Sequence, residues 1–166
     1  MVVMQQLSIV DEHDKVIGRA DIKEIHEKAL LHRAVHVFII DNEGRLFCRR
    51  RSRKKKRYPG FWLTSAGAHV MAGQDYDETA RSALRETLGI GCRLTMVGKA
   101  RIKDKWENEI SATYVGYSDA AMNFNPKQIE CGKFLTVSEI KKLPKQKNVT
   151  PHRAHSLGVY LEYKKK

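Results

Sequence analysis

The amino-acid sequence predicts an α/β fold in which a mixed β-sheet is sandwiched between α-helices. Strand-like apolar patterns occur on both sides of one amphipathic helix, and helical patterns return at the end of the chain. At 166 residues, with 42% apolar and 30% charged residues, the chain has the size and composition of one soluble domain with a proper core. No internal repeat or low-complexity linker divides it, so we expect a single domain over residues 1–166.

The N-terminal part is predicted to contain a hairpin and a short helix. Residues 7–19 have apolar residues on either side of a polar turn at Glu12–Asp14, which is typical of a short hairpin. We therefore expect residues 1–20 to form a short N-terminal extension. Residues 21–31 predict a helix or an extended turn.

A second hairpin is expected next in the chain. Residues 34–40 form a strongly apolar strand, residues 41–44 (DNEG) a tight turn, and residues 45–51 a returning strand. Residues 61–70 are expected to be extended.

The most regular helical pattern lies within residues 67–90. From Asp77 onward, apolar or small residues recur at i, i+3, i+4, i+7 and i+8, which is one face of a helix. Asp77 and Glu78 suit the N-terminus, where the helix dipole favours negative charge, and Gly89 suits a left-handed C-terminal stop. We expect one helix that ends near Gly89.

The second half of the chain returns to strands and ends in helices. Strands are expected over residues 93–102 and 106–117, and Phe134–Leu135 is expected to begin a last strand or turn. Thr136 and Glu139 predict a capping box on a short helix. A final helix is expected over residues 150–163, with a proline in its first turn.

A concentrated run of positive charge predicts an anionic ligand. The net charge is +12, and residues 49–57 hold eight basic side chains in nine positions between folded segments. Arg51 and Lys55 lie where a strand end meets a turn, which suits a clamp on a diphosphate. A nucleic-acid surface is the alternative, but aromatic residues for stacking are few beside this run. The C-terminal lysines are expected to form a frayed tail.

The three cysteines and the ends of the chain point to a cytoplasmic protein. Cys48, Cys92 and Cys131 show no paired spacing, so we expect reduced thiols in the core. No apolar run is long enough to span a membrane, and the first residues lack the pattern of a signal peptide.

Histidines and carboxylates are the candidate metal ligands. Glu107 and Glu109 stand at i and i+2 on one face of a predicted strand, with a solvated strand face as the alternative. Three histidines on connecting segments or strand ends complete the candidate set: His26, His32 and His69. Such a mixture suits Zn²⁺, Mn²⁺ or Fe²⁺ better than Mg²⁺. The other four are assigned to the surface or core: His13, His36, His152 and His155.

Several segments together resemble the Nudix family, and specifically its isopentenyl-diphosphate isomerase branch. They are LLHRAVHVFIIDNEGRLFCRRRS, YPGFW, SAGAHVMAG, RETLGI and WENEIS, in that order. The resemblance implies the Nudix fold and a divalent metal (Mn, Zn or Mg) held by His26, His32, His69, Glu107 and Glu109. It also implies diphosphate contacts from Arg51, Lys55 and, loosely, Lys23.

The same resemblance exposes departures from the family pattern. In the Nudix box, carboxylate positions fall on Gln74, Ala83 and Thr87, and only Glu86 remains. The catalytic cysteine of the isomerase branch falls on Gly67. Glu109 and Glu86 are therefore the candidate catalytic carboxylates.

Three functions follow as expectations. The first is a metal-dependent hydrolase of diphosphate-containing small molecules with a non-standard site. The alternatives are an isopentenyl-diphosphate isomerase in which another acid replaces the cysteine, and a catalytically lapsed Nudix domain that binds nucleotide or RNA. The substrate, the metal and the oligomeric state do not follow from the sequence.

Overall fold

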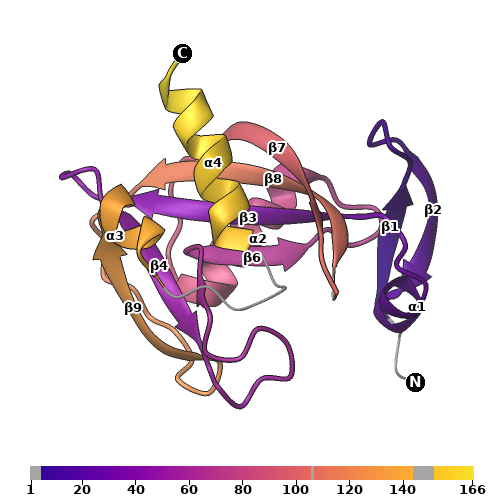
Figure 1. Cartoon of the computed structure of the whole chain (residues 1–166), viewed down its shortest axis with the longest axis horizontal. Helices are drawn as coiled ribbons and strands as arrows, with labels where there is room; N and C mark the ends of the chain where they lie inside the picture. Colours follow the sequence, from indigo (N-terminus) through magenta and orange to yellow (C-terminus); the bar gives the residue numbers. More distant parts are fainter. Residues whose placement is uncertain (1–4, 106, 144–151) are drawn as a thin grey trace.

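The strand β3 (His32–Ile40) lies at the centre of the sheet in the computed structural model (Figure 1). The structure describes residues 5–105, 107–143 and 152–166. All but one residue of β3 are buried, which explains its nearly continuous apolar sequence. Four strands pair with it: β1 (Gln6–Val10), β4 (Leu46–Arg51), β6 (Ala66–His69) and β8 (Asn108–Tyr117).

The remaining strands extend this arrangement through neighbours of β3. β2 pairs with β1, β5 and β9 pair with β4, and β7 pairs with β8, all antiparallel. The β3–β8 pair is parallel, so the sheet is mixed, as expected. The bounds are β2 (Val16–Asp21), β5 (Trp62–Leu63), β7 (Thr95–Lys103) and β9 (Ile129–Leu135).

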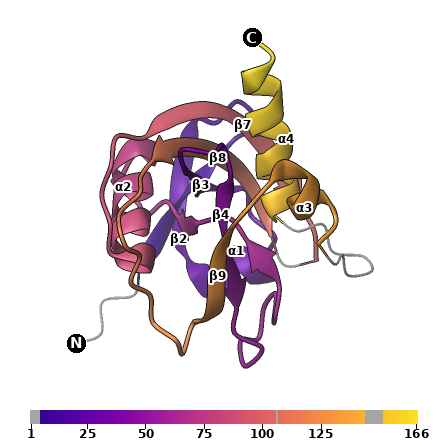
Figure 2. The same cartoon turned by 90° about the vertical axis from the view of Figure 1, so that its left-hand side faces the viewer.

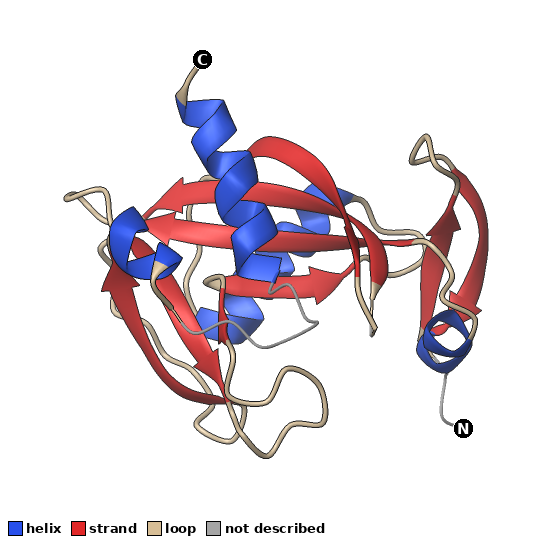
Figure 3. Cartoon of the chain, in the orientation of Figure 1, coloured by secondary structure: helices blue, strands red, loops and turns tan. Residues whose placement is uncertain are grey.

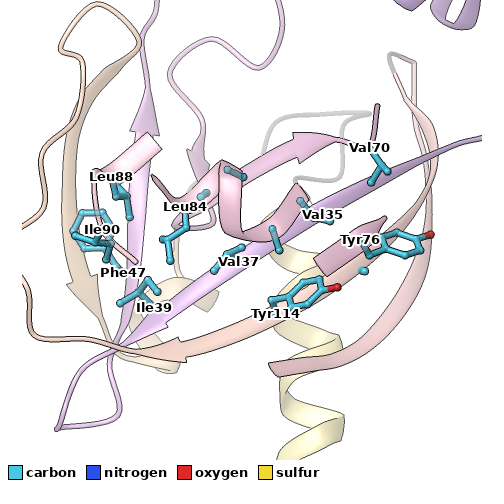
Figure 4. Packing of buried hydrophobic residues seen from close by; sticks show 14 residues of the cluster. Val35, Val37, Ile39, Phe47, Val70, Tyr76, Leu84, Leu88, Ile90 and Tyr114 are labelled. Carbon is cyan, nitrogen blue, oxygen red and sulfur yellow. The ribbon is translucent and has the colours of Figure 1, made fainter. Parts of the chain in front are cut away.

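Helices cover the two faces of the central strands (Figures 1 and 2). α2 (Tyr76–Leu88) packs on one face, where its apolar stripe meets the side chains of β3, β6 and β8 (Figure 4). α4 (His152–Lys164) and α3 (Val137–Lys141) close the other face, where Leu157 and Tyr160 join a second apolar cluster. The short α1 (Ile22–Glu27) lies beside the β1–β2 hairpin at one end of the molecule (Figure 3).

The central helix has the caps that its sequence predicts. Asp75 accepts a hydrogen bond from the backbone N–H of Glu78 at 2.8 Å, which begins the helix slightly before the expected residue. Gly89 ends it with a left-handed φ of 67°, a conformation that glycine adopts without strain.

Several other local expectations are confirmed. The N-terminal hairpin forms, α1 falls within residues 21–31, and Thr136 and Glu139 make the capping box of α3. The last helix runs to Lys164, while residues 150 and 151 of its expected start lie outside the described residues. No helix in the described ranges is long and apolar enough to cross a membrane.

Two strand expectations are wrong. β3 and β4 do not continue as a hairpin: they share only the Ile40–Leu46 pair, because β8 occupies one edge of β3 and β6 and β1 occupy much of the other. β4 pairs instead with β9 over most of its length. Phe134 and Leu135 end β9 rather than begin a strand, because the pairing with β4 starts at Ile129.

A partly buried ionic cluster at Asp14 fixes the N-terminal hairpin to the domain. The Asp14 carboxylate accepts hydrogen bonds from Arg33 Nε at 2.7 Å, Lys99 Nζ at 2.7 Å and the Tyr76 hydroxyl at 2.9 Å. These partners come from β3, β7 and α2. Burial alone would raise the pKa of this carboxyl, but the hydrogen bonds from Lys99 and Arg33 lower it overall. The hairpin leads directly into α1, so Asp14 also helps to position that helix.

We predict that Asp14→Asn destabilises the protein by about 1–3 kcal/mol at pH 7, the scale of lost hydrogen bonds to charged groups. Asparagine tolerates the left-handed backbone at this position, where φ is 63°. Because the folded-state pKa is lowered, the carboxylate's contribution to stability is fully present above its unfolded pKa of about 4 and is lost as the pH falls from there through the lower folded-state pKa. The melting temperatures of variant and wild type should therefore converge at low pH. Glu12→Gln in the same turn is the control, and a gap in melting temperature that does not shrink as the pH falls from 7 into the acid range would contradict the assignment.

Candidate metal centre

Three histidines and one glutamate from separate segments converge at one end of the sheet. His26, His32, His69 and Glu107 each offer a ligand atom, and these atoms all lie within 4.8 Å of one another. The imidazole rings of His32 and His69 are 5.1 Å apart between centroids, and that of His26 is less than 6 Å from both. Glu109 lies beside them, with Oε2 at 3.7 Å from His32 Nε2.

The strand register brings these residues together. In the parallel β3–β8 pair, His32 is the direct partner of Glu109, and in the β3–β6 pair His69 lies opposite Ala34. Glu107 immediately precedes β8, where its backbone N–H donates to the Asp104 carboxylate at 2.8 Å. His26 comes from α1 at the end of the N-terminal hairpin.

Glu107 is the common partner of the imidazoles. One of its oxygens is 3.1 Å from His32 Nε2 and 3.3 Å from His26 Nε2, and the other is 3.3 Å from His69 Nε2. Glu107 and Glu109 are both buried, with 6% and 1% of their surface exposed, which rules out a solvated strand face. Burial alone would raise the pKa of Glu107, but hydrogen bonds from His32 and His69 lower it.

The donor set fits a divalent transition metal. His32 Nδ1 lies 2.9 Å from the backbone oxygen of Leu30, a contact that orients the ring and directs Nε2 to the centre of the cluster. Ligand histidines in metal sites are held in this way by a carbonyl or carboxylate. Imidazole nitrogen together with carboxylate oxygen suits Zn²⁺, Mn²⁺ or Fe²⁺. Burial lowers the pKa of His26, which favours the neutral imidazole that a metal requires.

His36 occupies the space beside Gly67. Its Nε2 lies 3.4 Å from Glu109 Oε1, and its Nδ1 lies 3.4 Å from the Thr64 hydroxyl. A Cβ atom on residue 67 would come within 2.9 Å of His36 Nδ1, closer than real Cβ contacts. The absence of a side chain at the position matched to the family's cysteine therefore leaves room for this imidazole. Assigning His36 to the surface or core on sequence alone missed its place in the site.

A cavity of about 250 Å³ adjoins this group of candidate metal ligands. His36, His69, Glu107 and Glu109 form part of its wall, and arginines from β4 and the basic run form another part: Arg49, Arg51 and Arg57. Arg57 Nη1 is 2.8 Å from His26 Nε2 and 3.8 Å from Glu107 Oε1. The basic run therefore turns part of its charge inward.

The loop that carries these arginines is held by defined contacts. Arg51 Nε donates to the backbone oxygen of Arg57 at 2.8 Å, which ties the strand end to the loop. The Tyr58 hydroxyl donates to Asp104 at 2.7 Å, and Asp104 also accepts from the backbone of Glu107. Burial, followed by this hydrogen bond, raises the pKa of Tyr58. The basic loop and the turn before β8 are thus connected through Asp104.

Some expected residues lie elsewhere. Arg51 lines the cavity with the histidines and glutamates, whereas Lys23 is exposed on α1 and pairs with Glu27. Lys55 is half-buried in the basic loop but does not line the cavity. Glu86 is exposed on α2 and is not among the cavity residues. Glu109 is therefore the expected catalytic carboxylate that the fold brings to the cavity.

Two missed residues carry a signal that the sequence contains. His36 follows His32 at i+4 on one strand, and Arg49 precedes Arg51 at i−2 on another. Residues two or four apart in a strand share a face. Once His32 and Arg51 were candidates, the same periodicity could have identified His36 and Arg49. Arg57 gives no such signal, because its direction depends on the conformation of the loop.

Known proteins share this architecture and parts of this sequence. The NUDIX domain profile matches residues 30–155. The chain is 29% identical over 140 residues to isopentenyl-diphosphate Delta-isomerase 2 of Aromatoleum aromaticum, covering 81% of this chain and 74% of that one. It is also 29% identical to an uncharacterized Nudix hydrolase of Pseudomonas aeruginosa, in an alignment that covers 92% of this chain and 91% of that one. A crystal structure from Deinococcus radiodurans has a similar fold, with a TM-score of 0.65 at 24% identity over 81% of this chain and 85% of that one.

We predict that the purified protein binds Mn²⁺ or Zn²⁺ and that His69→Ala weakens binding at least tenfold, since even outer-sphere partners of a metal have effects of about this size. A metal that binds only the folded state stabilises it by about 2.7 kcal/mol when the free metal concentration is one hundred times its Kd. Calorimetry and thermal shift with added metal measure both effects. The exposed His13→Ala is the matched control. Equal metal affinity in His69→Ala and His13→Ala would exclude His69 as a ligand.

A second prediction concerns the fit between residue 67 and His36. Gly67→Ala should cost about 1–3 kcal/mol of stability, because it overpacks a filled site. His36→Ala should remove most of that cost, which gives a coupling energy of about 0.5–3 kcal/mol in a double-mutant cycle. Urea denaturation of the wild type, the two single variants and the double variant gives the four free energies of unfolding. Additive effects would show that the imidazole does not restrict residue 67.

Proposed function

This chain belongs to the NUDIX domain family, and we propose that it binds a divalent metal and hydrolyses a diphosphate-containing small molecule. The observation that carries the proposal is the convergence of His26, His32, His69 and Glu107 beside a cavity walled by arginines. A metal-ligand cluster and a set of fixed guanidinium groups are the two features that binding of a diphosphate requires. Relatives at 29% identity named as an isopentenyl-diphosphate isomerase and as a Nudix hydrolase support the ligand class.

Each group has a distinct task in this proposal. His26, His32, His69, Glu107 and Glu109 would hold the ion. When bound, the ion supplies Lewis-acid polarisation of a phosphoryl oxygen. Arg51 and Arg57 lie at the junction of cluster and loop, where they would bind the outer phosphoryl oxygens and offset their charge. The hydrogen bonds of the loop keep these guanidinium groups in place, so less ordering is needed when the ligand binds.

The isomerase alternative rests on the named relatives. Alkene isomerisation needs an acid and a base on opposite faces of the substrate. Glu109 supplies one carboxylate at the cavity, while Gly67 supplies no side chain and His36 fills the adjoining space. This arrangement favours hydrolysis over isomerisation. An isomer-exchange assay with isopentenyl diphosphate tests the alternative directly.

Nucleotide or RNA binding is the other alternative, and the outward part of the basic run favours it. Arg53, Lys54 and Lys56 are exposed. Affinity for single-stranded RNA through these side chains would fall steeply with salt and would not need His69. Binding that is lost in His69→Ala would instead favour the metal-dependent ligand.

We predict metal-dependent release of phosphate from at least one member of a panel of sugar, nucleoside and alkyl diphosphates. Glu109→Gln should lower kcat/KM about a hundredfold or more, the scale expected when a group that acts in the transition state is removed. Glu86→Gln tests the exposed carboxylate separately, and Glu78→Gln on the same helix is the control. Metal-loaded protein that turns over no diphosphate in the panel, or a Glu109→Gln variant with wild-type kcat/KM, would overturn the proposal.

A further inference from the structure

Arg49 presents a charged group to the cavity without a protein partner. It lies on β4 between Leu63 of β5 and Gly132 of β9, and its side chain lines the cavity. Its Nε atom is buried and has no hydrogen-bond partner, and no ion pair to its guanidinium occurs among the described residues. Burial and the neighbouring Arg51 lower its pKa to about 10, which still leaves the group charged at neutral pH.

A half-buried cation whose buried Nε has no hydrogen-bond partner is unfavourable in the free protein. Buried charges in proteins are paired or hydrogen-bonded, because removal from water is otherwise strongly unfavourable. The other arginines near the cavity have such contacts: Arg51 with the backbone of Arg57, Arg57 with His26, and Arg50, which does not line the cavity, with the backbone of Gly60. Arg49 alone of these four lacks one in the described part of the chain. An anionic ligand group would supply the missing partner.

The position of Arg49 separates it from the diphosphate contacts. Arg51 Nε contacts the backbone oxygen of Arg57 at the end of β4, and Arg57 contacts His26, one of the candidate metal ligands. Arg49 is two residues back along the strand, so its Cα atom is about 7 Å from that of Arg51 at the usual rise per residue. This spacing is longer than the single oxygen bridge between the two phosphoryl groups of a diphosphate. One diphosphate held at the metal and Arg51 would leave Arg49 without its anion.

We infer that Arg49 binds a second anionic group on the ligand, so that the substrate class is compact diphosphates that also carry a phosphoryl or carboxylate group. This inference rests on the proposed metal and diphosphate site. The cavity of about 250 Å³ is of a size that suits a small linker between the two anionic groups. Arginine binds either oxyanion through paired N–H donors. A simple alkyl diphosphate would place a hydrocarbon beside this guanidinium and leave it unpaired.

The test compares three probes by calorimetry with Mn²⁺ present: inorganic diphosphate, isopentenyl diphosphate and 5-phosphoribosyl 1-diphosphate. Wild-type protein should bind the phosphoribosyl compound at least tenfold more tightly than isopentenyl diphosphate. Arg49→Met, which keeps an unbranched but shorter side chain without the charge, should reduce this ratio to about one, and Arg49→Lys should keep part of it. Arg50→Met on the same strand is the matched control and should keep the wild-type ratio, because Arg50 is turned to Gly60 and Glu130.

The ligand-free proteins give a second readout. Arg49→Met should melt at or above the wild-type temperature, because it removes a half-buried charge whose Nε has no hydrogen-bond partner; a lower melting temperature with an unchanged ratio would identify a structural role and overturn the inference. Equal affinity of wild-type protein for the phosphoribosyl and isopentenyl compounds, or equal weakening of all three probes in Arg49→Met, would also overturn it. In each of these cases diphosphates still bind, so the proposed function survives. Failure of all three probes to bind in the presence of metal would instead overturn the proposed function together with this inference.

Discussion

The parallel pairing of β3 with β8 is the constraint on which the fold and the site both depend. It buries both faces of two adjacent strands, with α2 packed on one face and α4 and α3 on the other. The same register sets His32 directly beside Glu109 at the end of the pair. A shift by one residue would turn each side chain of one strand to the opposite face and would separate these ligands while exposing the core. Stability of the sheet and assembly of the metal ligands are therefore consequences of one alignment.

Charge is distributed unequally around the cavity. Two buried carboxylates lie with the histidines, and arginines face them from β4 and the basic loop. The carboxylates are compensated inside the protein, since Glu107 is contacted by three imidazoles and Arg57. Arg49 is not compensated in this way. The site thus contains polar partners for the buried carboxylates and lacks one for the Nε of Arg49, which is the physical basis for expecting an anionic ligand there.

Much of the fold was predictable because its signals are local. The caps at Gly89 and Thr136, the turn at Asp14 and the buried run of β3 each follow from residues close in sequence. The partner of β4 was not predictable, since pairing with β9 rather than β3 depends on which strands already occupy the edges of β3. The candidate metal ligands were inferred from family-like motifs, and strand periodicity could have added His36, whereas Arg57 required knowledge of the loop conformation. Sequence separation also concealed the contact of Tyr58 with Asp104.

The pair formed by Gly67 and His36 limits what similarity to the isomerases can imply. Sequence identity of 29% over most of the chain is sufficient to carry the sheet and the central helix, because these depend on burial and register. The reaction depends on a few atoms in the cavity, and in this chain a glycine at residue 67 leaves space that the His36 imidazole occupies. Restoring a side chain at residue 67 would require His36 to move, and His36 is linked to Glu109 and Thr64. A side chain at residue 67 would therefore entail a coupled rearrangement of the cavity, so the proposed substrate has to fit the arginines and the imidazole together.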